Sequence, residues 1–152
     1  MMLTTKELIA KYGAPNEAGT YLKTIVLPYP FLYDGKPVTK MRCHKLVADK
    51  FLAVFNDILA HYGLEEINRL GINKYGGCFN YRLMRGGTQL SRHSWGVAID
   101  LHPSANGLKT TYSKALFSKP EYAKMHEIFE KHGFINLGKT KGYDAMHFEI
   151  AS

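Results

Sequence analysis

The sequence predicts an α+β fold in which a small antiparallel sheet is flanked by helices. Two segments carry apolar residues at three- and four-residue spacing, the pattern of amphipathic helices, and short β-prone runs lie between them. Helices and strands do not alternate regularly as in a parallel sheet, which favours the α+β class. The 152 residues, of which 45% are hydrophobic, predict one domain over residues 1–152.

The N-terminal part predicts one short helix followed by extended chain. Thr4 and Glu7 form a capping-box pattern in front of a helix from about Thr5 to Lys11, and Gly13 offers a stop. The segment Tyr21–Val38 contains three prolines, which disfavour a helix. We therefore expect extended chain and a turn in this segment.

Two further helices are predicted from their apolar spacing. The longer runs from Cys43 to Tyr62 and should end at Gly63. The second should open with a capping box at Ser118–Glu121 and end at Gly133. Their expected core faces are Leu46, Val47, Phe51, Val54, Phe55, Ile58 and Leu59 in the first, and Tyr122, Met125, Ile128 and Phe129 in the second.

The predicted strands are three short β-prone runs. They cover Gly77–Arg82, Gly96–Leu101 and His147–Ile150, with glycine-containing turns between them.

Composition excludes some classes of function but does not choose among the rest. The formal charge of +7 favours contact with polyanions such as nucleic acid, anionic lipid or wall polymers. The two cysteines, Cys43 and Cys78, are expected to be buried thiols, and a single disulfide is the less favoured alternative. No secretory signal and no apolar run long enough for a transmembrane helix is visible.

The segment Ser91–Asp100 holds the first candidate site residues. It places His93 just before a glycine turn and Asp100 four residues into the strand that follows. Because side chains alternate along a strand, Asp100 faces the same side as Ala98 and the opposite side from the strand's three larger apolar residues. A carboxylate in such a strand is costly to bury unless it is paired or binds a metal. The segment therefore indicates a site.

The C-terminal segment Asp144–Ile150 completes the candidate site. Along it His147 alternates with apolar residues, so it can face Asp100 across the sheet, and Asp144 lies three residues earlier in a turn. Two histidines and one carboxylate are a standard ligand set for hydrolytic zinc, which keeps a position for water. These residues predict a Zn²⁺ site held by His93, Asp100 and His147. Asp144 could then take a proton from the water and give it to the leaving amine.

The remaining histidines are weaker candidates. His102 would face the same side as Asp100 if the strand continued, but Pro103 predicts that the strand ends, which favours a position on the rim of the site. The others lie in helical patterns without a metal-binding partner at suitable spacing, so we expect solvated or interfacial positions for them: His44, His61, His126 and His132.

Two motifs in order resemble a known family. The run S-x-H-x-x-G-x-A-x-D at 91–100, followed by D-x-x-H-F at 144–148, resembles the zinc D-alanyl-D-alanine carboxypeptidases and L-alanyl-D-glutamate endopeptidases. That group includes phage endolysins and the D-Ala-D-Ala dipeptidases of vancomycin resistance, and it shares its fold with the hedgehog signalling domain. The resemblance spans about Gly76–Glu149. It implies a hedgehog/DD-peptidase-like fold, the same three zinc ligands and Asp144 as the catalytic acid/base.

The resemblance also implies roles for residues upstream of the ligands. Tyr81-Arg82 resembles the family's Tyr-Arg pair, which implies that Arg82 stabilises the tetrahedral oxyanion or holds a substrate carboxylate. Arg85 is an alternative for that role. Ser91 resembles the family's substrate-contacting serine. The segment Gly133–Tyr143 replaces a tryptophan-rich stretch of many endolysins, and it should border the cleft and affect substrate preference.

The resulting hypothesis is a zinc-dependent peptidoglycan metallopeptidase that cuts stem peptides, preferably as an L-alanyl-D-glutamate endopeptidase. A D-alanyl-D-alanine carboxypeptidase or dipeptidase is the first alternative. A non-catalytic zinc-stabilised binding module is the second, and it would have no need of Asp144. Nucleic-acid binding lacks a basic helix or an aromatic stacking motif. We expect a monomer without membrane insertion, made in the cytoplasm without a visible signal peptide and acting at the bacterial wall after release or export by other means.

Overall fold

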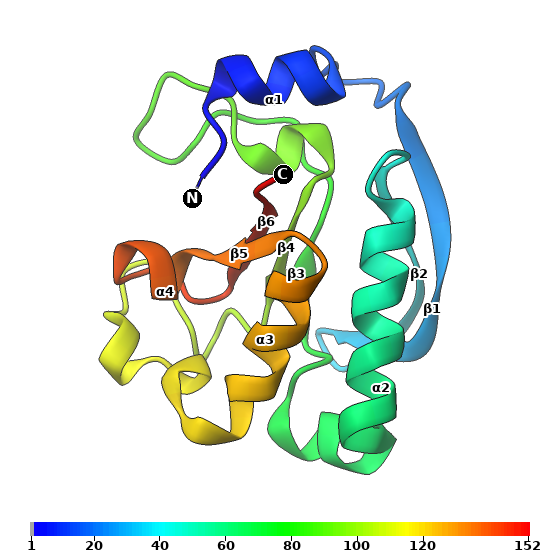
Figure 1. The fold of residues 1–152 in the computed structure, drawn as a ribbon, viewed down its shortest axis with the longest axis vertical. Helices are drawn as coiled ribbons and strands as arrows, with labels where there is room; N and C mark the ends of the chain where they lie inside the picture. The colour runs from blue at the N-terminus through cyan, green and yellow to red at the C-terminus, as the bar shows by residue number, and fades with distance from the viewer. Residues whose placement is uncertain (1) are drawn as a thin grey trace.

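The computed structural model describes residues 2–152 and has the predicted α+β class (Figure 1). Its strands form a two-stranded antiparallel hairpin, β1-β2, and a four-stranded antiparallel sheet in the order β3-β4-β6-β5. The strand bounds are β1 Leu22–Tyr33, β2 Lys36–His44, β3 Tyr75–Gly77, β4 Ala98–Leu101, β5 Phe134–Asn136 and β6 His147–Ile150.

Four α-helices and several 3₁₀ turns surround these sheets. Figure 1 shows α2 lying along the β1-β2 hairpin, and α3 packs against both α2 and β5. The helix bounds are α1 Thr5–Tyr12, α2 Ala48–Leu70, α3 Ala123–Lys131 and α4 Leu137–Lys141. The 3₁₀ helices are η1 Arg92–Trp95, η2 Tyr112–Lys114, η3 Leu116–Ser118 and η4 Pro120–Tyr122.

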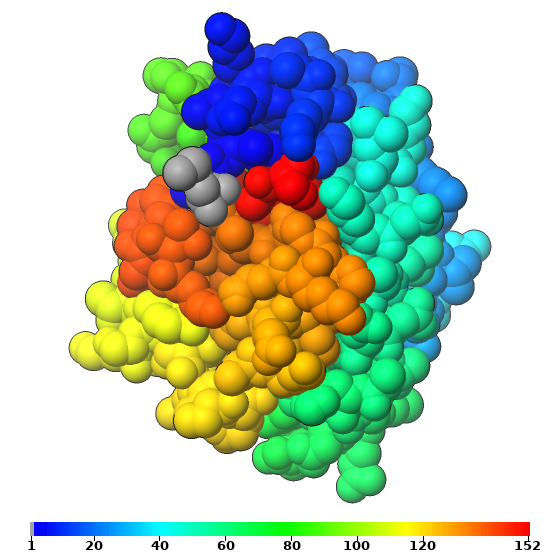
Figure 2. Space-filling model, in the orientation of Figure 1, coloured from blue at the N-terminus to red at the C-terminus, as the bar shows by residue number. Residues whose placement is uncertain are grey.

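The first helix confirms its predicted start. The Thr4 hydroxyl accepts a hydrogen bond from the Glu7 N–H at 3.1 Å, and the Glu7 carboxylate accepts one from the Thr4 N–H at 2.9 Å. These two bonds satisfy amides that the helix itself leaves unpaired. At its other end the Tyr12 hydroxyl donates to the Ser152 carbonyl at 2.6 Å. Helix α1 therefore lies against the C-terminal residues, as Figure 2 shows.

Both predicted bounds of the longest helix are wrong. Its expected first residue, Cys43, lies in strand β2, and Leu46 lies in the following turn with 58% of its surface exposed. Apolar spacing alone cannot separate the end of a strand from the start of a helix. Gly63, with φ 77° and ψ 158°, kinks the helix, which continues to Leu70.

The predicted capping box at Ser118–Glu121 is also wrong. The Ser118 hydroxyl donates to the Ala115 carbonyl at 2.8 Å, and a 3₁₀ turn precedes α3. The predicted apolar face is nevertheless buried, so the helical periodicity is confirmed. Within this face Phe129 stacks on Phe148 of β6 with the ring centroids 4.0 Å apart.

The strand predictions succeed for β4 and β6 and fail elsewhere. The predicted strand Gly77–Arg82 is wrong, because only Tyr75–Gly77 pairs with β4 and the chain then leaves the sheet. Strand β5 was not predicted from its three residues. The hairpin tolerates prolines because its register shifts between Val26 and Phe31, so the prolines between them need not donate to a neighbouring strand.

The structure also bears on the predictions for the cysteines and for membrane-spanning helices. Cys43 and Cys78 are both buried free thiols, as predicted. Burial raises the pKa of the Cys43 thiol to about 12 and that of Cys78 well above its ordinary value, which favours inert thiols. Among residues 2–152, no helix combines the length and the apolar character needed to cross a membrane.

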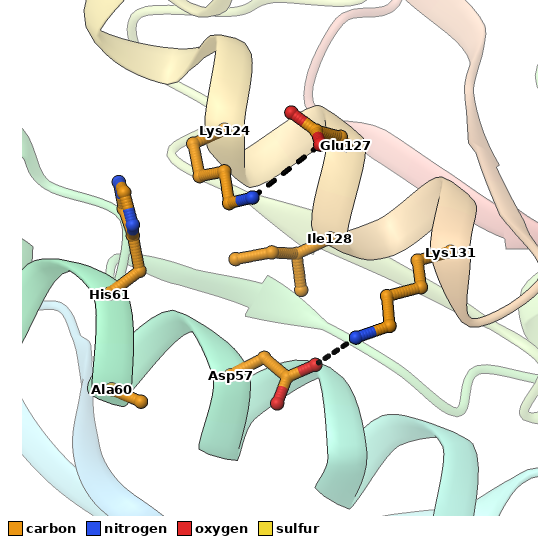
Figure 3. Close-up of a pocket in the computed structure, with 7 residues that line it drawn as sticks. All are labelled: Asp57, Ala60, His61, Lys124, Glu127, Ile128 and Lys131. Atoms are coloured by element: carbon orange, nitrogen blue, oxygen red, sulfur yellow. Dashed lines mark hydrogen bonds and ion pairs between the residues drawn. The ribbon is translucent and has the colours of Figure 1, made fainter.

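A shallow cavity of about 410 Å³ lies between α2 and α3. Figure 3 shows that its charged side chains face one another, with Lys131 pointing at Asp57 and Lys124 at Glu127. The Asp57 carboxylate also lies 2.7 Å from Nε2 of His132. The Lys124–Glu127 pair lies within α3, whereas Asp57 of α2 pairs with Lys131 at the end of α3 and with His132 just after it.

Candidate metal centre

Strand pairing places Asp100 beside His147. The two residues are directly opposite in the β4-β6 register, so their side chains lie on the same face of the sheet. Nδ1 of His147 is 3.1 Å from Oδ1 of Asp100. Gly76 in the neighbouring strand makes room for this carboxylate, since a Cβ on Gly76 would lie 2.9 Å from Cβ of Asp100.

The 3₁₀ helix η1 brings His93 to the same carboxylate. The Ser91 hydroxyl accepts the His93 N–H at 3.2 Å and so caps this turn, which ends at Gly96 with φ 72°. Nε2 of His93 lies 3.2 Å from Oδ2 of Asp100. Its other ring nitrogen, Nδ1, lies 2.7 Å from the carbonyl oxygen of Cys78. Because a carbonyl only accepts, Nδ1 carries the proton in that bond.

The three predicted ligands fit a divalent cation. One ligand atom from each of His93, Asp100 and His147 lies within 4.8 Å of the other two. Nε2 of His93 is buried, and no other residue that the structure describes forms a hydrogen bond with it. In the form that carries its single proton on Nδ1, the lone pair of Nε2 points toward the Asp100 carboxylate, and a cation between these two acceptors would satisfy both. Two imidazole nitrogens and one carboxylate are a common zinc donor set.

The shifted pKa values of the candidate ligands show that this site favours a positive charge. Burial raises the pKa of Asp100, but the neighbouring imidazoles of His147 and His93 outweigh this effect and hold the pKa well below its ordinary value. Burial lowers the pKa of His147, yet its hydrogen bonds to Asp100 and Glu149 raise the net pKa to about 10. The carboxylates thus retain a proton on His147, and a metal cation would compete with this proton.

Asp144 lies in the turn before β6 and lines the same cavity. It adopts a left-handed backbone with φ 66°, which aspartate tolerates better than most residues. Its surface is only 8% exposed, and its Oδ1 is buried without a hydrogen-bond partner among residues 2–152. Burial raises the pKa of this carboxyl. A carboxylate in this condition is suited to exchanging a proton.

The cavity around these residues has a volume of about 800 Å³. The three ligands and Asp144 line it together with residues from loops far apart in the sequence. Its basic side chains are Arg82, Arg85, Arg92, Lys109 and Lys141, and its acidic ones are Asp100, Asp144 and Glu149. The segment that replaces the tryptophan-rich stretch contributes Leu137, Lys141, Gly142 and Tyr143, so it borders the cavity as expected.

The predicted substrate-contact residues also line the cavity, with different degrees of anchoring. The backbone of Arg82 is held on both sides by Ser94, whose hydroxyl accepts from the Arg82 N–H at 3.1 Å and donates to the Arg82 carbonyl at 3.0 Å. Arg85 is exposed in the loop that follows. Ser91 is buried, and its hydroxyl already accepts the His93 amide.

Three histidine predictions need correction. His102 does not line the cavity; it packs against Gly71, where an added Cβ would meet its ring at 2.6 Å. His44 and His126, expected at solvated or interfacial positions, are buried. Each satisfies a backbone group, with His44 Nε2 2.9 Å from the Tyr12 carbonyl and His126 Nε2 2.8 Å from the Phe117 carbonyl.

Two residues at the site, one buried and one partly buried, were not predicted. Glu149 lies beside His147, and Arg92 lies beside Glu149. The alternation along β6 places Glu149 on the same face as His147, and this was the available signal. Arg92 sits in the motif next to His93, but nothing in the sequence pattern distinguishes it from a surface arginine.

Comparison with known proteins agrees with the two motifs. Residues 85–150, fewer than half of the 152, match the family model described as D-alanyl-D-alanine carboxypeptidase. The match includes all three residues of the metal group and Asp144, while Arg82 lies just outside it. No curated protein matches the chain. The expected hedgehog/DD-peptidase type of fold follows from the family match together with the observed α+β arrangement. Over residues 85–150 the chain therefore carries the sequence pattern of the D-alanyl-D-alanine carboxypeptidase family, which confirms the resemblance.

Proposed function

We propose that this protein is a zinc metallopeptidase that hydrolyses amide bonds in peptidoglycan stem peptides, with the L-alanyl-D-glutamate bond as its preferred target. The observation that carries the proposal is the convergence of His93, Asp100 and His147 in a cavity, within a segment that matches a peptidase family. We propose that it acts as a monomer at the bacterial wall.

The roles of the chain's own groups follow from their environments. When bound, a zinc ion would act as a Lewis acid on the scissile carbonyl and would lower the pKa of water. The Asp144 carboxylate would take the proton released during attack and return it to the leaving amine. Its free, buried oxygen and the upward direction of its pKa both support this role. A binding module would have no need of such a group.

Arg82 is the better candidate than Arg85 for holding an oxygen of the substrate. Both line the cavity, but only Arg82 has its backbone fixed to the turn that carries His93, through Ser94. A fixed donor stabilises developing charge without having to reorganise during the reaction.

The charge of the cavity supports a substrate that carries carboxylates. Its five basic side chains come from two regions of the chain, residues 82–92 and residues 109–141, and outnumber its three carboxylates. A glutamate beside the scissile amide would place a carboxylate within this positive environment. This charge pattern is the support for the L-alanyl-D-glutamate bond.

The second candidate is a D-alanyl-D-alanine carboxypeptidase. It is favoured by the description of the family model that matches residues 85–150. The same basic side chains could hold the terminal carboxylate of a shorter peptide. The two candidates differ in product: internal cleavage gives new N-terminal glutamate, whereas a carboxypeptidase releases free D-alanine.

Digestion of purified peptidoglycan tests the proposal. Zinc-loaded protein should produce new N-terminal glutamate, and a chelator should abolish this product until zinc is restored. Release of free D-alanine without internal cuts would shift the assignment to the second candidate. Folded, zinc-loaded protein that yields neither product would refute the peptidase proposal and favour the binding module.

A further inference from the structure

A buried carboxylate lies directly behind the candidate ligand His147. Glu149 is 2% exposed, and its Oε1 lies 2.9 Å from Nε2 of His147. We infer that Glu149 is a positioning residue that fixes the His147 ring for metal binding, and that Arg92 holds Glu149 in place. The inference rests on the proposed metal centre and adds two residues to it.

The contacts of His147 leave its ring one productive orientation. Nε2 faces Glu149, and Nδ1 faces Asp100 at 3.1 Å. Since a carboxylate can only accept, Nε2 must carry the proton of the first contact. With Nε2 committed to Glu149, a metal shared with Asp100 and His93 would bind at Nδ1 in place of the proton that faces Asp100. The nitrogen that binds the metal is set by the hydrogen bond that the other nitrogen makes.

The strands explain why Glu149 can reach this ring. Residues 147 and 149 lie on one face of β6, because side chains two apart in a strand point the same way. The residue opposite Glu149 in β4 is Ala98, which is fully buried. Its methyl group leaves the space in which the Glu149 side chain turns back toward His147. The alanine of the first motif therefore has a packing role in the site.

Arg92 provides the charge opposite Glu149. Its Nε lies 3.8 Å from Oε2 of Glu149, and both atoms are buried without a hydrogen-bond partner. The rest of the guanidinium is anchored by the start of the chain, because it donates to the Leu3 carbonyl at 2.7 Å and to the Thr5 hydroxyl at 3.3 Å. Two such charges facing each other in a buried site balance one another.

The ligand turn η1 thus serves both sides of the metal centre. It carries His93 as a ligand and, in the adjacent residue, the arginine that faces the partner of His147. The N-terminal segment before α1 secures that arginine. Removing a carboxylate that orients a ligand imidazole typically weakens metal binding by about 10–100-fold.

Zinc affinity of the full chain tests the inference without any substrate. Competition with a fluorescent zinc chelator should show a dissociation constant about 10–100-fold higher for Glu149→Ala than for the wild type. Glu149→Gln should lose less zinc affinity than Glu149→Ala, because its amide oxygen can still accept a hydrogen bond from Nε2. The zinc affinity of Arg92→Met should lie between those of the two Glu149 variants and that of the wild type. Glu130→Gln is the control, since it removes an exposed carboxylate that pairs with Lys139, and it should bind zinc like the wild type.

Imidazole NMR of the zinc-loaded protein separates positioning from a general loss of packing. In the wild type the Nε2–H proton of His147 should be shifted far downfield and exchange slowly, because it is buried against a carboxylate. This signal should be lost in Glu149→Ala and move upfield in Glu149→Gln. Wild-type zinc affinity together with an unchanged signal in Glu149→Ala would overturn the inference.

The near-isosteric Glu149→Gln keeps the test decisive should the alanine variant fail to fold. An unchanged signal and unchanged affinity in folded Glu149→Gln would also overturn the inference. The outcome is separable from that of the proposed function. A wild-type protein that binds zinc but cuts no wall peptide would refute only the peptidase proposal. Glu149 variants that bind zinc as tightly as the wild type, with an unchanged His147 signal, would refute only the positioning role.

Discussion

Asp100 and Asp144 line one cavity, yet their surroundings move their pKa values in opposite directions. Asp100 lies between two imidazoles, and their proximity holds its pKa well below the ordinary value despite burial. Asp144 has a buried oxygen without a partner, and burial raises its pKa. Two carboxylates whose pKa values are shifted in opposite directions take different roles in a site. Asp100 suits a permanently charged ligand and Asp144 suits a proton carrier.

We predict that Asp144→Asn abolishes turnover and leaves zinc binding intact. The amide has the size of the carboxylate but cannot take up the proton, which should lower kcat by about 10²–10⁴-fold. Hydrolysis of wall peptide and zinc content should be measured on the same preparation. Asp34→Asn is the matched control, because Asp34 is also an aspartate at positive φ but lies exposed in the β1-β2 turn. Turnover retained by Asp144→Asn would remove Asp144 from the mechanism.

At the scale of elements, one strand pairing and one 3₁₀ helix set the positions of the candidate ligands. The β4-β6 pairing places Asp100 opposite His147, and η1 places His93 against the same carboxylate. Gly96 joins these two elements with φ 72°, and its carbonyl accepts the amide of His44 at 2.9 Å. The end of the hairpin is therefore tied to the turn that carries a ligand.

We expect Gly96→Ala to destabilise the fold more than Gly35→Ala. Both glycines have positive φ, which should cost an alanine about 1–2 kcal/mol. At Gly35 a Cβ meets nothing within 4 Å, whereas at Gly96 it would lie 2.8 Å from the His44 nitrogen. That overlap should add about 1–3 kcal/mol. Urea unfolding of the two variants gives the comparison, and equal losses would mean that the close approach at Gly96 has no energetic effect.

Burial of His126 on α3 predicts a loss of stability in mild acid. Burial lowers its folded pKa, so the unfolded chain takes up a proton as pH falls through about 6.5 while the folded chain resists it. This group alone should make the free energy of unfolding fall by up to about 1.4 kcal/mol per pH unit below that point. Unfolding in chelator at about pH 7 and about pH 5.5 should show a smaller fall for His126→Gln than for the wild type. An identical decrease in the free energy of unfolding for the two proteins would show that His126 does not cause the loss of stability in acid.

Local pattern predicted some of these elements and failed for others, for physical reasons. The capping box at Thr4 and the buried face of α3 depend on nearby residues, and both were correct. Strand β5, with three residues, is too short to show an alternating pattern. The error at Cys43 arose because buried residues in adjoining elements share one apolar run.

At the scale of the whole molecule, the site joins parts of the chain that are far apart in sequence. The group of candidate ligands could be predicted because two histidines and an aspartate recur in recognisable motifs, and one ligand atom from each lies within 4.8 Å of the other two. The roles of Glu149 and Arg92 could not be predicted from the sequence, because they depend on the packing of β6 against β4 and of the N-terminal segment against η1. A motif identifies ligands, whereas the groups that orient them become visible only in three dimensions.

X-ray absorption at the zinc edge of the purified protein tests the central claim most directly. The proposed metal centre should hold one zinc per chain with two imidazole nitrogens at about 2.0–2.1 Å and a carboxylate oxygen at about 2.0–2.2 Å. The histidine signature should weaken in His93→Ala and in His147→Ala. Absence of bound zinc, or sulfur ligands at about 2.3 Å from the buried thiols, would contradict it.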